Sequence, residues 1–234
     1  MSSVEIEIYP DDGWVERVTA RWVSFIESQS AARLCLPTGS TPKEVYERAA
    51  ATIDLSRTEV FVLDEFGLPP GDPARCDEML ERDLLSRLSG RPAHVHALDP
   101  QALDLAEECK RFEQLVEAGG LDLTLLGLGG NGHLGLNEPG STEDSPTRVA
   151  QLQASTIEAA GRYGSDSQPE WGMTLGLRQI LSSREIWLLV TGDHKAEILE
   201  RTLNGPIGPE LPASYLRDHP NVVVFADQSA AAAL

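Results

Sequence analysis

Lysine is scarce in this chain, and basic residues are far outnumbered by acidic ones. The 234 residues include 19 lysines and arginines against 37 aspartates and glutamates, which gives a formal net charge of −18 at pH 7. Such a surface repels nucleic acid and anionic membranes, so we expect neither as a partner. An acidic protein still holds an anionic metabolite where backbone amides and one or two cations converge. The three lysines, Lys43, Lys110 and Lys195, therefore each deserve a check for a role near a turn.

Cysteines and long apolar runs are also lacking. Only Cys35, Cys76 and Cys109 occur, with no C-x-x-C pair and no cysteine-histidine cluster. This pattern argues against a disulfide framework or a zinc site. The N-terminal stretch has no basic head followed by an apolar run, and no window approaches 18 apolar residues. The sequence therefore predicts a soluble protein of the reducing cytoplasm.

Short apolar runs alternate with amphipathic stretches along the chain. The predicted strands are 4–9, 33–36, 59–63, 94–98, 121–128, 185–190 and 221–225, and the predicted helices are 13–27, 42–51, 76–88, 103–118 and 195–203. Strands that alternate with helices are typical of βαβ units. The sequence thus predicts a single α/β domain over 1–234, with a Rossmann-like, mostly parallel sheet flanked by helices. Ligands bind such a sheet at the carboxyl ends of its strands.

One segment, 141–172, interrupts this pattern. It is polar, has weak periodicity, and is too long for a plain connection between two elements. Its composition fits a mobile surface excursion and an active-site lid equally well.

The turn in the segment LPTGSTPKE, at 36–44, connects a predicted strand to a predicted helix. Thr41 fits the N-cap of that helix, Pro42 its first position and Glu44 the acid of a capping box. Free amides at the positive end of a helix bind phosphate or carboxylate, and hydroxyls beside them add donors. The hydroxyls here belong to Thr38, Ser40 and Thr41. The Walker A pattern is absent, and the alternative is a well-capped helix that binds nothing.

Two adjacent acids, Asp64 and Glu65, end an apolar strand. Neighbouring residues of a strand point to opposite faces, so at most one of them points into a ligand crevice. A carboxylate at that place can act as a general base. The alternative is an acidic turn on an acidic protein.

A glycine-rich run, 127–140, surrounds His133. It formally contains G-x-G-x-x-G after a strand, but the later glycines and Pro139 prevent a long helix, so we reject a dinucleotide site. Glycines allow the backbone to approach a ligand closely. Glu138 is near enough in the chain to orient the imidazole, and a histidine held by a carboxylate works as an acid-base group near neutral pH.

A second turn from strand to helix, at 190–197, carries Lys195 in the first helical turn. A lysine beside a helix N-terminus opposes the helix dipole, so an anion is one reason for its presence there. The alternative is an ordinary solvated lysine.

Taken together, these motifs resemble the glucosamine-6-phosphate deaminase family, within the wider group that includes the phosphogluconolactonases. The resemblance extends from about 36 to 225 and rests on LPTGSTP, LDEFGLP, LDLTLLGLGGNGHLGLNEPGS, the arginine of AAGRYG, MTLGL, REIWLLVTGDHKAEIL and LPASYLRDHPNVVVFAD. Lactonases typically have an arginine where this chain has Phe66, and Gly-His-Thr-Ala-Ser where this chain begins its GHLGLNEP run. The deaminase branch therefore fits better. It implies aldose-ketose isomerisation with deamination of a 2-amino-2-deoxyhexose 6-phosphate, giving a ketohexose 6-phosphate and ammonia. This reaction implies no metal and no redox cofactor.

The resemblance also implies residue roles. Asp64 matches the base that moves a proton between C2 and C1 of the open sugar. His133 matches the group that assists ring opening by moving a proton between O1 and O5, and Glu138 matches the carboxylate that supports it. The phosphate-binding residues of the family match Gly39, Ser40, Thr41, Arg162 and Lys195. A phosphate ligand within 141–172 favours the lid.

One position departs from the family pattern. The family usually has Asp-Gly-His, whereas this chain has Asn131 before Gly132 and His133. Loss of a nearby anion disfavours the imidazolium, and it removes one acceptor that could hold the ring. Sequences described as galactosamine-6-phosphate isomerases or deaminases resemble this chain at the same run, so we expect the galacto epimer as substrate. A phosphogluconolactonase-type hydrolase and an inactive sugar-phosphate-binding protein remain alternatives, and the sequence leaves monomer or homo-oligomer open.

Overall fold

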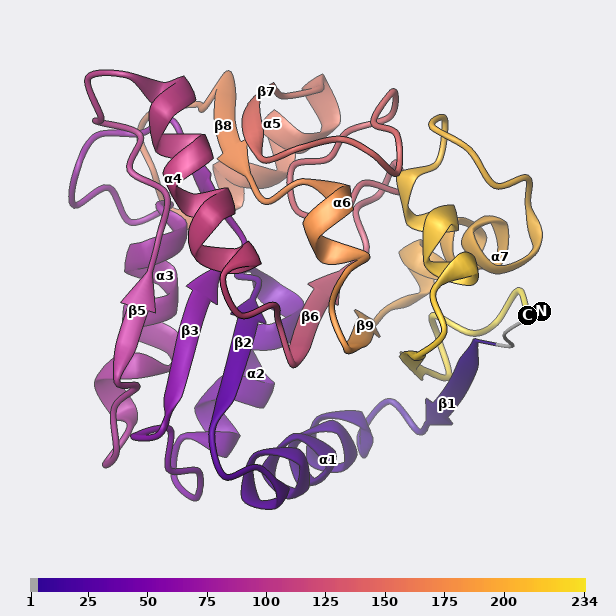
Figure 1. The fold of residues 1–234 in the computed structure, drawn as a ribbon. Coiled ribbons are helices and arrows are strands. Elements are labelled where there is room, and N and C mark those ends of the chain that lie inside the picture. The colour runs from indigo at the N-terminus through magenta and orange to yellow at the C-terminus, as the bar shows by residue number, and fades with distance from the viewer. Residues whose placement is uncertain (1–3) are drawn as a thin grey trace.

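A seven-stranded sheet, parallel throughout, forms the centre of the protein (Figure 1). The computed structural model describes residues 4–234, so residues 1–3 of the predicted domain and of the N-terminal stretch lie outside it. The strand order is β1-β10-β9-β6-β2-β3-β5. The strands are β1 (Glu5–Tyr9), β2 (Ala32–Leu36), β3 (Thr58–Val62), β5 (His94–His96), β6 (Leu123–Gly127), β9 (Glu185–Val190) and β10 (Val222–Asp227). All seven predicted strands are confirmed.

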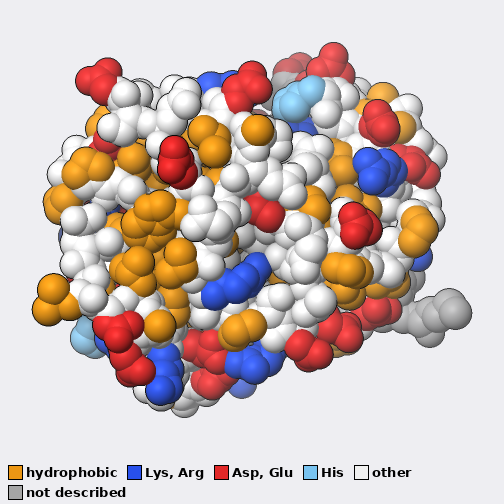
Figure 2. Space-filling view, turned by 90° about the horizontal axis from the view of Figure 1, so that it is seen from above, with side chains coloured by type: hydrophobic (Ala, Val, Ile, Leu, Met, Phe, Trp, Pro, Cys, Tyr) orange, Lys and Arg blue, Asp and Glu red, His pale blue; other side chains and the backbone are white. Residues whose placement is uncertain are grey.

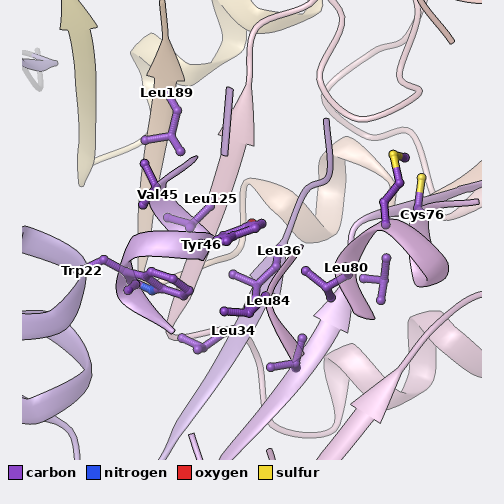
Figure 3. Close-up of a cluster of buried hydrophobic side chains, with 14 of the residues drawn as sticks. Trp22, Leu34, Leu36, Val45, Tyr46, Cys76, Leu80, Leu84, Leu125 and Leu189 are labelled. Carbon is purple, nitrogen blue, oxygen red and sulfur yellow. The ribbon is translucent and has the colours of Figure 1, made fainter. Parts of the chain in front are cut away.

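Helices cover both faces of this sheet. One face packs against α1 (Trp14–Ser28), α2 (Ser40–Ala49) and α3 (Cys76–Asp83). The other face packs against α4 (Leu105–Glu117), α6 (Leu177–Ile180) and α7 (Ala196–Asn204). Side chains alternate accordingly, because successive residues of a strand point to opposite faces. Leu34 and Leu36 lie in the first cluster, with Trp22 and Tyr46 (Figure 3), whereas Cys35 lies in the second. The predicted Rossmann-like α/β domain is confirmed.

The start of α2 differs from the prediction. The helix begins at Ser40, with Gly39 as its N-cap and no side-chain cap, so the predicted cap at Thr41 and the capping box with Glu44 are wrong. Gly39 has φ 111°, a conformation that favours glycine, and it turns the chain into the helix before the proline. Pro42 then lies within the first turn, where its missing N–H leaves no bond unmade.

Helix ends also shift elsewhere. The predicted helix 76–88 divides into α3 and a 3-10 turn at Leu85–Arg87, and a 3-10 turn at Asp193–Lys195 precedes α7. Asp104 caps α4 with bonds from the amides of Ala106 and Glu107.

A small antiparallel sheet in the order β4-β8-β7 was not predicted. It joins β4 (Asp64–Phe66) to β8 (Trp171–Thr174) and β7 (Arg148–Gln151). The polar segment 141–172 therefore contains strands, together with α5 (Ala154–Ala160) and a 3-10 turn at Gly161–Tyr163. Its predicted movement as a lid stays a prediction.

The strand order places a topological switch at the centre of the sheet. From β2 the chain winds to β3 and β5, and from β6 it winds the other way to β9 and β10, so β2 and β6 are neighbours. Ligands bind outside the carboxyl ends of strands at such a point. Within residues 4–234, no helix has the length and apolarity to cross a membrane.

Candidate active site

A cavity of about 780 Å³ opens at the switch point. Its walls come from the loops after β2, β3 and β6, from the 3-10 turn before α7, and from α5 with the turn that follows it. Seen from above, the molecule shows acidic and basic side chains interspersed, with no large basic patch on that face (Figure 2). An anion in this cavity would therefore have to be held by the groups that line it.

The N-terminus of α2 forms one end of the cavity. The predicted phosphate-binding residues Thr38, Gly39, Ser40 and Thr41 all line it. A β-carbon on Gly39 would lie 2.9 Å from the hydroxyl oxygen of Tyr163, so a larger residue would have to displace that side chain as well as adopt the φ of 111° that favours glycine. Free amides at the start of this helix and the neighbouring hydroxyls give the donor set that phosphate needs.

Two cations complete this end of the cavity. Arg162 and Lys195, the two predicted phosphate-binding cations, both line it, and their role stays a prediction. Burial, and next the charge of Arg162, lower the pKa of the Lys195 ammonium, whose Nζ donates to the carbonyl oxygen of Leu128 at 2.7 Å. Among the ion pairs within residues 4–234, neither cation has a carboxylate partner. Two unpaired cations in so acidic a protein indicate an anion site.

The two adjacent acids separate as strand geometry requires. Asp64 lines the cavity. Glu65 is fully buried and accepts bonds from the amides of Cys76 at 2.8 Å and Asp77 at 3.1 Å, so it caps α3. Only Asp64 is therefore placed to act on a ligand.

Asp64 has the electrostatics of a general base. Burial raises the pKa of its carboxyl to about 6, although the charge of His133 and a hydrogen bond from the Cys76 thiol act in the opposite direction. A base whose pKa lies just below the working pH is ionised yet still binds a proton well.

His133 faces the same cavity from the loop after β6. Its ring packs on the backbone of Gly129, where a β-carbon would lie 2.4 Å from Nε2. Nδ1 lies 3.5 Å from Oε2 of Glu138 and 3.3 Å from the hydroxyl oxygen of Thr156. The opposite nitrogen remains for a ligand, so the ring has the arrangement of an acid-base group held by a carboxylate.

Glu138 lies behind His133 and outside the cavity lining. Burial alone would raise the pKa of its carboxyl, but hydrogen bonds from His133, Thr156 and Asn131 together lower it to about 2. Glu138 therefore stays ionised and supports the ring.

Asn131 does not line the cavity either. Its amide nitrogen donates to Glu138 at 2.7 Å and to the side-chain oxygen of Gln153 at 3.1 Å, while its oxygen accepts from the backbone amide of His133 at 3.2 Å. We expected asparagine in place of the usual aspartate to remove an acceptor for the ring, but the side chain at this position bonds to Glu138, Gln153 and the backbone of His133 and not to the imidazole. The ring is held by Glu138 and Thr156, and Asn131 fixes Glu138.

Sequence reasoning missed three residues near the site, Gln153, Thr156 and Tyr163. Gln153 is the N-cap of α5, Thr156 lies on this short helix and Tyr163 lies in the turn after it, where the AAGRYG motif pointed only to Arg162. A hydroxyl or amide that acts only through a histidine far away in the chain leaves no local signal.

Metal ligation has no candidate among the described residues. No group of three or more histidine, cysteine, aspartate or glutamate side chains in residues 4–234 is arranged to hold an ion. Cys35, Cys76 and Cys109 are free and buried. The groups present suit proton transfer on a small phosphorylated molecule.

Comparisons with known proteins agree with this geometry. The family model of glucosamine-6-phosphate isomerases and 6-phosphogluconolactonases matches residues 12–225. A glucosamine-6-phosphate deaminase of Rhodopirellula baltica is 40% identical over 99% of this chain and 96% of its own length. A glucosamine-6-phosphate deaminase 2 of Bacillus subtilis is 37% identical over 88% of this chain and 87% of its own.

Solved structures show the same relationship. A monomeric glucosamine-6-phosphate deaminase superimposes with a TM-score of 0.93 at 34% identity, covering 99% of this chain and all of that one. The 6-phosphogluconolactonase of Thermotoga maritima superimposes at 0.78 with 22% identity, covering 97% of this chain and all of that one, and so shares the fold. These three relatives above 30% identity are named as glucosamine-6-phosphate deaminases, which are enzymes. This chain belongs to the glucosamine-6-phosphate isomerase and 6-phosphogluconolactonase family.

Proposed function

We propose that this protein converts a 2-amino-2-deoxyhexose 6-phosphate and water to a ketohexose 6-phosphate and ammonia. One observation carries the proposal: a raised-pKa carboxylate, a carboxylate-held histidine and an unpaired cation pair share one cavity. An isomerising deaminase needs a base, a ring-opening group and a phosphate anchor, and each has a candidate here. No metal or redox cofactor is part of the proposal.

The chemistry follows from where the groups lie. His133 moves a proton between O1 and O5 and opens the ring, while Glu138 stabilises the charge on the imidazole. Asp64 removes the C2 proton and returns it to C1, which leaves a ketimine at C2. Water adds to C2, and ammonia leaves as the carbonyl forms. Arg162, Lys195 and the start of α2 hold the phosphate throughout.

Glucosamine 6-phosphate is the first substrate to test, because the named relatives are glucosamine-6-phosphate deaminases. The predicted preference for the galacto epimer stays a prediction. Asn131, on which it rested in part, bonds to Glu138 and Gln153 and does not line the cavity, so it favours neither epimer by direct contact.

The assay is ammonia release from each epimer at equal concentration, with lactone hydrolysis measured beside it. Release from either epimer supports the proposal, and the ratio decides the epimer. Rapid lactone turnover without ammonia would identify the hydrolase instead. Binding of sugar phosphate without any turnover would identify the inactive binding protein. The cytoplasmic location stays a prediction, and monomer or homo-oligomer stays open.

The rate should depend on pH through Asp64. A base acts only when ionised, and the pKa of this carboxyl is about 6, so kcat/KM should be constant above that pH and fall below it. The decrease should approach about tenfold per pH unit. A profile from pH 4.5 to 8, with kcat measured separately at saturating substrate, checks this. An undiminished rate at pH 4.5 would show that another group is the base.

Asn131→Asp should weaken the support of His133. The change replaces the donor to Glu138 with a second carboxylate at a place where the two oxygens would lie close. We expect the free energy of unfolding at pH 8 to fall by about 1–2 kcal/mol, since a hydrogen bond is lost and like charges meet. The difference should shrink as pH is lowered and one carboxyl takes a proton. Denaturation of the variant and the wild type at pH 8 and at pH 5 measures this difference. If the variant is as stable as the wild type at both pH values, the role given to Asn131 is contradicted.

A further inference from the structure

One short segment reaches both ends of the cavity. α5 and the turn after it bring Thr156 to His133, and a few residues later bring Arg162 and Tyr163 to the start of α2. The 3-10 turn Gly161–Tyr163 follows α5 without a break. The same short segment thus contacts both the acid-base group, His133, and the candidate phosphate site.

At the histidine end, the contacts favour one tautomer of His133. Glu138 is ionised and accepts only, and it lies 3.5 Å from Nδ1. The buried hydroxyl of Thr156 lies 3.3 Å from the same nitrogen and also bonds to Glu138. A hydroxyl that donates to the carboxylate offers the ring a lone pair, so both neighbours of Nδ1 are acceptors. Nδ1 then carries the proton, and Nε2 is free to accept one from a sugar oxygen.

The same segment also contacts Glu138 through a second residue, Gln153. The backbone amide of Gln153, at the N-cap of α5, donates to Oε1 of Glu138 at 3.3 Å, and its side chain accepts from Asn131. A displacement of α5 therefore moves the hydroxyl of Thr156 and loosens the carboxylate together.

At the phosphate end, the segment contributes Arg162 and Tyr163, which both line the cavity. Among the ion pairs of residues 4–234, Arg162 has no carboxylate partner, and it lies close enough to Lys195 for its charge to lower the pKa of that ammonium. Tyr163 packs over Gly39, the N-cap of α2. An anion between Arg162, Lys195 and the helix start would relieve the repulsion of the two cations and hold the segment in place.

We propose that Thr156 is a positioning residue, and that phosphate bound at Arg162 fixes α5 and thereby holds His133 in its Nδ1-protonated form. The inference rests on the proposed function, because it assigns the phosphate site and the ring-opening group to the same reaction. It means that a sugar without its phosphate is opened poorly even when it occupies the cavity. By thermodynamic reciprocity, orienting His133 also favours phosphate binding.

The test is NMR of the nitrogen-15-labelled imidazole rings in the intact protein, titrated with inorganic phosphate. The His133 signals are those missing from His133→Gln. In the wild type, phosphate should increase the share of the Nδ1-protonated tautomer. Thr156→Val should bind phosphate within about threefold of wild type but show little tautomer response, whereas Thr156→Ser should restore it. Thr156→Ala serves as a second variant without the hydroxyl.

Thr202→Val is the matched control. Thr202 is also buried, and its hydroxyl donates to a backbone oxygen of α7, away from the cavity. It should leave the tautomer response as in the wild type, which separates positioning from the general loss of a buried hydroxyl. With the aminosugar phosphate, Thr156→Val should lower kcat about tenfold with KM nearly unchanged, the effect of one lost hydrogen bond.

The outcomes are distinguishable. If the wild type binds phosphate and the His133 signals do not respond, or if Thr156→Val responds as the wild type does, the coupling is wrong while the proposed function stands. If phosphate does not bind at all, both the coupling and the phosphate site of the proposed function fail. Ammonia release by the wild type tests the proposed function separately.

Discussion

Asp64→Asn is expected to release no measurable ammonia while it still binds sugar phosphate. The asparagine keeps the size of the side chain but accepts no proton, so the transfer from C2 to C1 loses its carrier. We expect a loss of at least about 10³-fold in kcat, within the range attributed to a positioned base. Binding should survive, because the residues proposed to hold the phosphate, Arg162, Lys195 and the start of α2, line the same cavity and are unchanged in this variant.

The same variant should be more stable than the wild type at pH 8. The pKa of Asp64 is raised to about 6 by burial, so above that pH the folded protein carries a buried charge at a cost. Because the pKa is higher in the folded state, the Asp64 carboxyl stabilises the folded protein most at pH values below its unfolded-state pKa. This stabilisation is lost as the pH rises from about 4 to 6. A neutral asparagine removes the cost, which we expect to raise the free energy of unfolding by about 1–3 kcal/mol at pH 8.

Asp122→Asn is the control for Asp64→Asn. Asp122 lies outside the cavity, where it accepts from the amide of Arg33 and pairs with Arg184. This control should keep wild-type turnover. Ammonia assays and denaturation curves on both variants decide the matter, and an Asp64→Asn protein with near wild-type turnover would show that the base has been assigned to the wrong residue.

His133→Gln should have the second largest effect. Without the imidazole, ring opening depends on the slow reaction of the free sugar, and we expect kcat to fall by roughly 10²- to 10⁴-fold, the usual contribution of general acid-base catalysis. Glu138 would lose its hydrogen bond from the ring, so the pKa of its carboxyl should rise from about 2.

His96→Gln is the matched control. His96 lies on β5, away from the cavity, and pairs with Glu59 at 3.6 Å. Its turnover should equal that of the wild type. Steady-state kinetics on both variants is the measurement, and a His133→Gln enzyme within a few fold of wild type would leave ring opening to another group.

The inner strands of the main sheet were predictable because they are short, buried and apolar, whereas the edge strands β1 and β5 are largely exposed. Leu34 and Leu36 face one helix layer and Cys35 the other, so neither side of such a strand needs polar residues. Asp64 and His133 were predictable for a related reason. Asp64 comes just after β3 and His133 lies in the loop after β6, and parallel strands bring their carboxyl ends to one edge of the sheet.

The small antiparallel sheet was not predictable from local pattern. Its strands have three or four residues, and two of them lie wholly or partly in the polar segment 141–172. The start of α2 was misplaced because Thr41 and Glu44 fit a capping box, whereas the positive φ of Gly39 decided where the helix begins. Thr156 was missed because its contact with His133 is set by tertiary packing.

The most direct test of the account is ammonia release by the wild-type protein from glucosamine 6-phosphate, with galactosamine 6-phosphate run alongside and Asp64→Asn as the blank. The account predicts equimolar ammonia and ketohexose 6-phosphate from at least one epimer, and none from the blank. No ammonia from either epimer, at concentrations where calorimetry shows the sugar phosphate bound, would contradict it.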